Sequence, residues 1–544
     1  LALLAMAAPL MQTELSAQTQ WSPVPAGYPT TAAEESDFTR HTRHLEMWDY
    51  LQALRAVTPE MRLGVYGETR EGRRLPYAVF SRPLVSEPWE AWTLGRPVLV
   101  LAANVHGGER TFREGLLVLM RDMATPGTEA NALLDELVVV VAPQINPDGF
   151  EASEGGQRGN SWGIDLNRDY VKLEHPSIQT YVGGLLGGFR PHLFVDGHNG
   201  GVYPYNLNYQ CTSSHDPAPE LTRVCDREIF PHIDARLEAE GYKGWYYQNG
   251  DENQWNTGGW QARIGRNYGG FVNSVGILFE APGGQSLEDG ARAGYLGYLA
   301  VMEWSAANAE RLMGTVRDAR LATLRLGHDP AGSVAVQQEY AAEDDPVSYQ
   351  IPVGTPQQVR AALQAGERPE LRTITDARLM KKPVATVLRD RPYAYLLPRA
   401  AEQAVALLRR HGIVVERLQE PTELSVQAYT VAGVTHEQAY NHAAATRVQV
   451  GEVLTTTREF PQGTYVIPTG QMLGRLVAHM LEVESDDNVV YWNTMDAWLP
   501  RPGEGAGQGD EEGPQGRPDQ GPPLVPIFKL LRPTPLNTVM VEGR

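Results

Sequence analysis

The sequence contains few of the features that mark several large classes of protein. Only two cysteines, Cys211 and Cys225, occur in 544 residues, and their positions match no metal-binding cysteine motif. No apolar run reaches the roughly 20 residues that a bilayer-spanning helix needs. Lys and Arg number 47 against 66 Asp and Glu, which gives a formal net charge of −19. We therefore predict no transmembrane span and no nucleic-acid partner, since binding to the phosphate backbone requires clustered positive charge.

The beginning of the chain favours export. Residues 1–11 are almost wholly apolar and a polar stretch follows them, which is typical of a secretory signal peptide that lacks its basic start. A short buried helix is the alternative. We assign residues 1–20 to a signal-peptide remnant and expect a secreted or periplasmic protein. In such a compartment Cys211 and Cys225 can form a disulfide, and two free buried thiols are the other possibility.

The remaining composition is that of a globular protein, with 42% hydrophobic and 21% charged residues. Apolar strand-like runs alternate with helical patterns in the first part of the chain, at 97–103, 137–141, 193–195 and 275–279. Buried strands that alternate with helices predict an α/β fold, with a mixed, mostly parallel sheet covered by helices on both faces.

The length of the chain predicts more than one folded unit. We expect a catalytic domain over residues 21–335, a polar linker over 336–385 and a smaller mixed α/β accessory domain over 386–544. Residues 500–523 are rich in Gly, Pro, Asp, Glu and Gln, which predicts a flexible insertion. The accessory domain shows no catalytic motif.

A candidate metal site begins at His106-Gly107-Gly108-Glu109, directly after the apolar run 97–103. The two glycines allow a sharp turn, and helical spacing of apolar residues predicts that Glu109 opens a helix that extends to Ala124. Catalytic zinc takes three protein ligands and keeps one position open. The best third ligand is His198, which follows another apolar strand, because ligands gather at the carboxyl ends of strands in such sheets. His175 and His192 compete for this role.

Further motifs occur in a recognisable order along the chain. After HxxE at 106–109 come Asn-Pro-Asp-Gly at 146–149, GxDxNR at 163–168, His198 after a strand, and a strand that ends in Glu280. Together these motifs resemble the zinc carboxypeptidase A-like metallopeptidases over roughly residues 50 to 310. The resemblance implies one Zn²⁺ per chain, bound by His106, Glu109 and His198.

The resemblance also implies roles for other polar residues. Asp165 accepts a hydrogen bond from the first histidine ligand and fixes its tautomer. Asn167 and Arg168 match the pair that holds the C-terminal carboxylate of a peptide substrate. Arg158 matches the arginine that polarises the scissile carbonyl, and Glu280 matches the general base.

The family also places a mobile tyrosine over the substrate. Tyr268 is our candidate, with Tyr246 and Tyr247 as alternatives. Two nearby arginines, Arg263 and Arg266, suggest a preference for an acidic C-terminal residue, whereas solvated surface arginines are the plainer interpretation.

The sequence thus predicts an exported zinc metallocarboxypeptidase whose partner is a peptide with a free C-terminal carboxylate. Two alternatives remain open. One is a zinc amidohydrolase of N-acyl amino acids or cell-wall peptides, which offer the same amide beside a carboxylate. The other is a noncatalytic binding protein on the same fold, which the presence of Glu280 disfavours.

Overall fold

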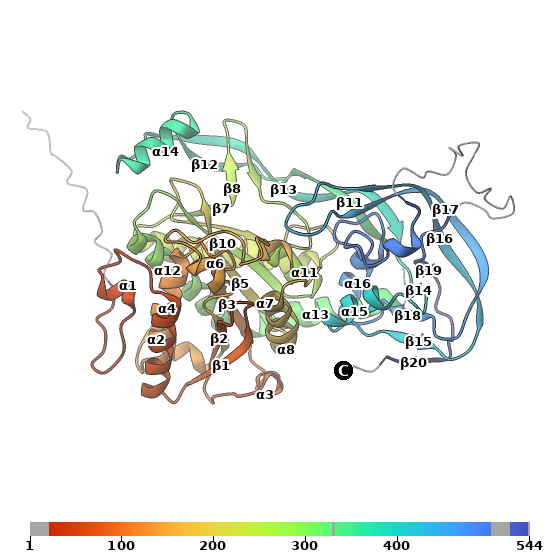
Figure 1. The fold of residues 1–544 in the computed structure, drawn as a ribbon. Coiled ribbons are helices and arrows are strands. Elements are labelled where there is room, and N and C mark those ends of the chain that lie inside the picture. The colour runs from red at the N-terminus through yellow and green to blue at the C-terminus, as the bar shows by residue number, and fades with distance from the viewer. Residues whose placement is uncertain (1–20, 329–331, 502–522, 542–544) are drawn as a thin grey trace, which may run out of the picture.

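The protein consists of two units bridged by long strands (Figure 1). The computed structural model describes residues 21–328, 332–501 and 523–541. The signal-peptide remnant at 1–20 and most of the expected insertion at 500–523 lie outside the described residues. No helix of the described chain combines the length and apolarity needed to cross a membrane.

The first unit is built on a mixed sheet of eight strands within the described residues. In spatial order the strands are β1 (Met61–Glu68), β2 (Arg74–Phe80), β4 (Val138–Ala142), β3 (Val98–Ala103), β5 (Leu193–Gly201), β10 (Val275–Pro282), β6 (Leu207–Cys211) and β7 (Gly244–Tyr246). The pairs β3–β4, β3–β5, β5–β10 and β6–β7 are parallel, and the other pairs are antiparallel. The predicted fold class, a mostly parallel mixed sheet in an α/β unit, is confirmed.

The central strands are apolar throughout because both of their faces are covered. In β3, Leu99 and Leu101 belong to one buried cluster while Val98 and Val100 belong to another, as expected from the alternation of side chains along a strand. The helices that pack on the first face include α2 (His44–Val57), α4 (Thr111–Ala124), α10 (Phe230–Glu238), α12 (Leu287–Ala307) and α13 (Ala309–His328). The second face carries α7 (Pro176–Gln179), the π-helical segment η3 (Thr180–Leu186) and α11 (Gly265–Phe271).

The second unit is a seven-stranded sheet, counted over the described residues. Its order is β17 (Thr446–Phe460), β16 (Thr422–His436), β19 (Phe528–Leu530), β14 (Ala394–Leu397), β18 (Tyr465–Pro468), β15 (Glu416–Leu418) and β20 (Thr538–Met540). Helices α15 (Glu402–Arg410) and α16 (Gly474–Leu481) lie beside this sheet (Figure 1). Buried residues of this unit, such as Tyr395 and Leu476, fall in the same apolar cluster as Val100 and Phe194 of the first sheet. The two units therefore share one continuous core.

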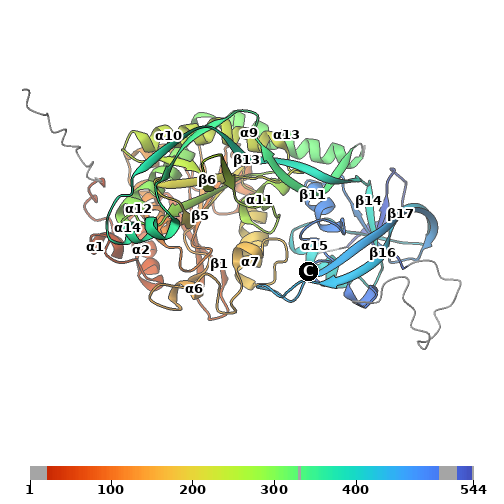
Figure 2. The ribbon, with the colours of Figure 1, turned by 90° about the horizontal axis from the view of Figure 1, so that it is seen from above.

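The segment that we expect to be a linker, residues 336–385, is instead ordered. It contributes to β11 (Ser333–Ala342), β12 (Val347–Pro352), α14 (Pro356–Gln364) and β13 (Leu371–Asp390). Strand β13 pairs with β11 and β12 and lies parallel to β9 (Gln254–Thr257), which also pairs with β8 (Gln248–Gly250). The polar composition that suggested a linker belongs to strands with one solvated face. Figures 1 and 2 show β11 and β13 running from one unit to the other.

The two cysteines form a disulfide, which decides between the alternatives left open by the sequence. Cys211 at the end of β6 is bonded to Cys225, the first residue of the π-helical segment η4 (Cys225–Ile229).

The remaining short helices are α1 (Ala32–Glu35), α3 (Pro88–Thr93), α5 (Glu129–Ala132), η1 (Leu133–Asp135), α6 (Pro147–Glu151), η2 (Leu166–Arg168), α8 (Gly187–Phe189), α9 (Pro219–Val224) and η5 (Asp496–Trp498).

Candidate metal centre and active site

The turn after β3 is shaped by close backbone contacts. Asn104 adopts a left-handed conformation with φ of 60°, and its side-chain amide donates to the carbonyls of His106 and Glu109 at 2.8 and 2.9 Å. A Cβ on Gly107 would lie 2.0 Å from the carbonyl carbon of Gly149. The motif at 106–109 thus requires glycine because the turn packs directly on the loop that carries the motif at 146–149.

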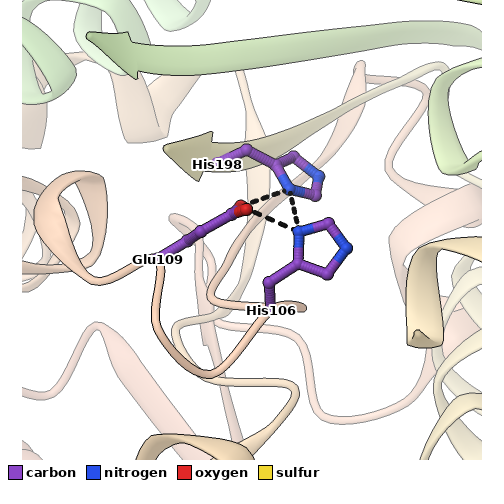
Figure 3. Close-up of side chains that lie close together, drawn as sticks. All are labelled: His106, Glu109 and His198. Atoms are coloured by element: carbon purple, nitrogen blue, oxygen red, sulfur yellow. Dashed lines mark hydrogen bonds and ion pairs between the residues drawn. The ribbon is translucent and has the colours of Figure 1, made fainter. Parts of the chain in front are cut away.

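Three side chains converge at this turn (Figure 3). The Nδ1 atoms of His106 and His198 lie 3.1 Å apart. Glu109 Oε2 lies 2.9 Å from the first Nδ1 and 2.8 Å from the second. Among the described residues, these three form the one group of His, Cys, Asp and Glu with ligand atoms close enough for a shared metal. Glu109 itself lies in the turn, because α4 begins two residues later at Thr111. The predicted helix start is therefore corrected.

Each histidine is oriented by a carboxylate on its other ring nitrogen. His106 Nε2 lies 2.8 Å from Asp165 Oδ1, and His198 Nε2 lies 3.0 Å from Asp196 Oδ2. A proton shared with these carboxylates leaves each Nδ1 with a free lone pair that faces Glu109. Asp196 was missed from the sequence, although it stands two residues before His198 on one strand, and side chains at that spacing share a face.

The electrostatics of the group favour a bound cation. Burial lowers the pKa of both imidazoles, but the neighbouring carboxylates, Glu109 for His106 and Asp196 for His198, outweigh this effect and raise the pKa values above normal. Burial raises the pKa of Glu109, and the two histidines more than reverse that effect. The site therefore stabilises positive charge at its centre, and two imidazoles with one carboxylate form a donor set used by catalytic zinc.

The other predicted histidines lie elsewhere. His175 caps α7, where its Nδ1 accepts a hydrogen bond from the backbone of Ser177. His192 Nδ1 accepts a hydrogen bond from the backbone of Val98 at 3.0 Å. The structure thus brings His198, and neither competitor, to the centre.

Glu280 lies next to the centre on the neighbouring strand. It pairs in register with His198 across the parallel strands β10 and β5 and is 7% exposed. Its Oε2 atom is buried without a hydrogen-bond partner in the described chain. Burial raises its pKa to about 7, and the charge of Glu109 adds to this effect. Glu280 is thus a carboxyl group that changes its protonation state near neutral pH.

Arg158 reaches the centre from the loop between the motifs. Its guanidinium binds Asp165 Oδ2 through Nε and Nη2 at 2.9 and 2.8 Å, and Nη1 lies 3.2 Å from Glu109 Oε1. Its side chain remains 50% exposed. The structure therefore places this cation beside Glu109 and Asp165, with half of its side chain exposed.

Asn167 and Arg168 lie in η2, which is capped by the side chain of Asp165. Asn167 Oδ1 accepts a hydrogen bond from the backbone of Gly265 at 2.8 Å, and its Nδ2 lies 3.3 Å from His198 Nε2. Arg168 Nη1 donates to the carbonyl of Asn167, and its positive charge contributes to a lowered pKa of Asp165. Both residues therefore border the centre.

Tyr268 does not face the centre, so this candidate is corrected. Its ring is buried, and its hydroxyl lies 3.0 Å from Nδ1 of His411 in the second unit. The physical reason is that Tyr268 lies on the face of α11 that packs into the shared core. For Tyr247, burial raises the pKa, and the charges of Glu280 and Glu109 raise it further.

Of the two arginines noted in the sequence, Arg263 is partly buried and Arg266 is buried. The Nε of Arg263 forms a 2.6 Å ion pair with Asp487, and Nη1 donates to the hydroxyl of Tyr491. Arg266 is 3% exposed. Solvated surface arginines, the plainer interpretation of the sequence, are therefore excluded.

The fold and the site together define a class of protein. A His, Glu and His set at the carboxyl ends of parallel strands, with a buried carboxylate beside it, is typical of zinc-dependent hydrolases of α/β fold.

Comparison with known proteins identifies a domain within the chain. Residues 47–226 match the family model Peptidase M14, zinc carboxypeptidase. "Probable carboxypeptidase 2" of Trichophyton verrucosum is 25% identical over 453 residues, which cover 77% of this chain and 80% of that protein. Carboxypeptidase D of Mus musculus is 28% identical over 234 residues, which cover 37% and 17% of the two chains. Among solved structures, a metallo-carboxypeptidase from Pseudomonas aeruginosa has 22% identity and a TM-score of 0.39, with 50% and 70% of the chains covered. Residues 47–226 therefore carry a zinc carboxypeptidase domain, and this match together with the carboxypeptidase relatives supports a zinc-dependent metallocarboxypeptidase.

Proposed function

We propose that this protein is an exported zinc carboxypeptidase that removes single residues from the C-terminus of peptides. The observation that carries the proposal is the buried Glu280 carboxylate, without a hydrogen-bond partner in the described chain, beside the group formed by His106, Glu109 and His198. A buried carboxylate is costly unless it is satisfied or has a catalytic task.

The three ligand residues fit zinc. His106 and His198 present Nδ1, and Glu109 presents Oε2, with all three atoms within 4.8 Å of one another. Zinc bound there would supply Lewis acidity and lower the pKa of water. Asp165 and Asp196 hold the imidazoles in the orientation that binding requires.

Glu280 and Arg158 would perform the proton transfer and charge stabilisation. Glu280, whose pKa burial raises to about 7, would accept a proton from the attacking water and return it to the leaving amine. The exposed part of the Arg158 guanidinium would stabilise the negative charge that develops on the carbonyl oxygen. Its contacts with Asp165 and Glu109 support this role, because they hold the arginine beside the ligands.

Asn167 and Arg168 would bind the C-terminal carboxylate of the substrate. A guanidinium forms paired, charge-assisted hydrogen bonds with a carboxylate, and this requirement would restrict cleavage to the last residue. Tyr247, rather than Tyr268, would cover the bound substrate. The charged groups that affect its pKa are Glu280, Arg266, Glu109 and Arg158.

The disulfide supports export. Stable disulfides are typical of oxidising compartments, and Cys211 and Cys225 are joined. The apolar residues 1–11 of the sequence agree with a secretory signal. We further propose a catalytic unit on the first sheet and an accessory unit on the seven-stranded sheet, with β11 to β13 joining them.

The proposal is tested with two peptides of identical sequence, one with a free C-terminal carboxylate and one with a C-terminal amide. Mass spectrometry follows the products with zinc, with chelator, and after zinc is restored. We expect zinc-dependent loss of the last residue from the free peptide only. Cleavage of N-acyl amino acids or cell-wall peptides without trimming of the free peptide would overturn the carboxypeptidase proposal in favour of an amidohydrolase.

A further inference from the structure

Arg266 is a buried cation with no acidic partner in the described part of the chain. It is the second residue of α11 and is 3% exposed. No ion pair involves its guanidinium among the described residues, and its Nε atom is buried without a hydrogen-bond partner there. Buried charges in folded proteins are normally paired, because an unpaired one loses its hydration without compensation.

Arg263, three residues earlier, shows how the same chain satisfies a structural arginine. Its guanidinium forms an ion pair with Asp487 and a hydrogen bond with Tyr491, both in the second unit. Arg263 thus joins the two units with its charge neutralised. Arg266 has no equivalent, so packing between the units does not explain it.

The groups that form hydrogen bonds with the Arg266 guanidinium are polar but uncharged. Its Nη2 donates to the carbonyl of Gly259 at 2.5 Å, and the hydroxyl of Tyr340 forms a hydrogen bond with its side chain. That hydroxyl also lies 2.8 Å from Ser213 Oγ and 2.9 Å from the carbonyl of Gly258. These contacts hold the guanidinium in place without neutralising it.

The wider electrostatic surroundings connect Arg266 to the proposed active site. Burial lowers its pKa, and the like charge of Arg168 lowers it further, while Glu280 and Tyr247 act in the opposite direction. The backbone N–H of Gly265, directly before Arg266, donates to Oδ1 of Asn167, directly before Arg168, at 2.8 Å. Arg168 and Arg266 are thus two guanidinium groups on neighbouring segments. One substrate carboxylate can neutralise only one of them.

We propose that Arg266 binds the side-chain carboxylate of the substrate's last residue, so that the enzyme prefers peptides ending in Glu or Asp. This inference rests on the proposed function. A C-terminal acidic residue carries two carboxylates: the main-chain group binds Arg168 and the side-chain group binds Arg266. Tyr340 and Gly259 fix the direction of the guanidinium, and a preoriented fork favours a planar carboxylate over a neutral group.

The wild-type enzyme provides the first test. The kcat/KM values are measured for peptides that differ only in the last residue, which is Glu, Asp, Gln, Leu or Lys. Gln matches Glu in size and lacks its charge. We expect Glu or Asp to exceed Gln on the order of 100-fold, because a buried charge left unpaired is strongly penalised. Equal or faster removal of Gln, Leu or Lys would overturn the inference.

A pair of variants provides the second test. Arg266→Gln keeps a donor for Gly259 but removes the charge, and we expect kcat/KM for the Glu peptide to fall to that of the Gln peptide while Gln removal is retained. The control is Arg317→Gln, whose side chain is 70% exposed on α13, and we expect it to leave both values unchanged. An unchanged Glu preference in Arg266→Gln would contradict the inference.

Three further outcomes are distinguishable. If Arg266→Gln does not fold, as judged by circular dichroism, the wild-type ranking decides alone. If the metal-loaded wild-type enzyme trims no peptide, whatever its last residue, the proposed function fails. If the enzyme trims peptides without favouring acidic residues, only the inference on Arg266 fails.

Discussion

Two buried glutamates, one in each unit, differ in how their carboxylates are hydrogen-bonded. Glu482, which follows α16, is 0% exposed and lies 2.8 Å from Nζ of Lys529. The hydroxyls of Tyr395 and Tyr429 donate to its two oxygens at 2.6 and 2.7 Å. Glu280 has no such network: its Oε2 is buried without a partner in the described chain.

The difference distinguishes a buried charge that stabilises the fold, Glu482, from one with a proposed catalytic role, Glu280. A fully satisfied network such as that of Glu482 rigidifies the core in which it lies. An unsatisfied buried carboxylate reduces stability. The same burial raises its pKa toward neutral pH. The comparison therefore predicts that the two glutamates control different properties of the enzyme.

Replacement of Glu280 by Gln provides the largest expected effect. We expect kcat to fall by about 10²- to 10⁴-fold, since a carboxamide cannot accept the proton of water. The melting temperature should stay equal or rise, because the neutral amide is less costly to bury. Peptidase assays and thermal melts measure both properties, with Glu238→Gln on the exposed surface of α10 as control. A variant that keeps its activity, or that unfolds, would break the comparison.

Replacement of Glu482 by Gln is expected to have the opposite profile. Lys529 would remain buried without its counter-charge, which lowers the free energy of unfolding by about 3–5 kcal/mol. The kcat of the molecules that remain folded should not change. Denaturant titration of Glu482→Gln and of Glu482→Gln with Lys529→Met measures the effect, and the double variant should recover much of the loss. A lower kcat in the folded enzyme would show that Glu482 takes part in catalysis, and the two glutamates would then not control different properties.

Removal of zinc is expected to affect stability less than Glu482→Gln does. The carboxylates around His106 and His198 favour positive charge at the centre, so the metal-free protein should be less stable. Zinc at 100 times its Kd should add about 2.7 kcal/mol to the free energy of unfolding. Thermal melts with zinc and with chelator measure this difference. His198→Ala should reduce it strongly, and an unchanged zinc effect in that variant would place the metal elsewhere.

The smallest expected effect is a pH dependence at the junction of the two units. Burial lowers the pKa of His411 to about 4, below the usual value of about 6.5. Between these values the unfolded chain binds a proton that the folded chain does not, so this histidine makes the protein less stable as the pH falls from 6.5 to 4. At pH 5 the loss relative to neutral pH is about 2 kcal/mol.

The check compares wild-type protein with His411→Gln in denaturant titrations at pH 7 and pH 5. The stability advantage of the wild type should shrink by about 2 kcal/mol at the lower pH. The exposed His328 supplies a control variant, His328→Gln. A difference that does not depend on pH would show that His411 is not held neutral.

The first sheet and the convergence of His106, Glu109 and His198 could be predicted because their signals are local. Apolar runs followed directly by His106 or His198 fix both the strand and the edge at which the ligand emerges. Asp196 was within reach of the same reasoning, since strand alternation places it on the face of His198.

The positions of Tyr268 and Tyr340 could not be predicted from such signals. Tyr268 turns away from the site because it packs on His411, which is 143 residues away in the sequence. Tyr340 approaches Ser213 and Gly258 only because β11 and β13 cross over the first unit. Such contacts depend on the packing of distant segments, which composition and periodicity do not encode.

The contact of Tyr340 with Ser213 and Gly258 also limits how the chain can be divided or recombined. A fragment that ends at residue 335, the limit expected from the sequence, would lose Tyr340 and most of β11, and with them part of the shell around Arg266. A cut at residue 335 therefore leaves the surroundings of Arg266 incomplete, because β11 continues to Ala342. With the proposed role of Arg266, such a cut would also change which peptides the enzyme prefers.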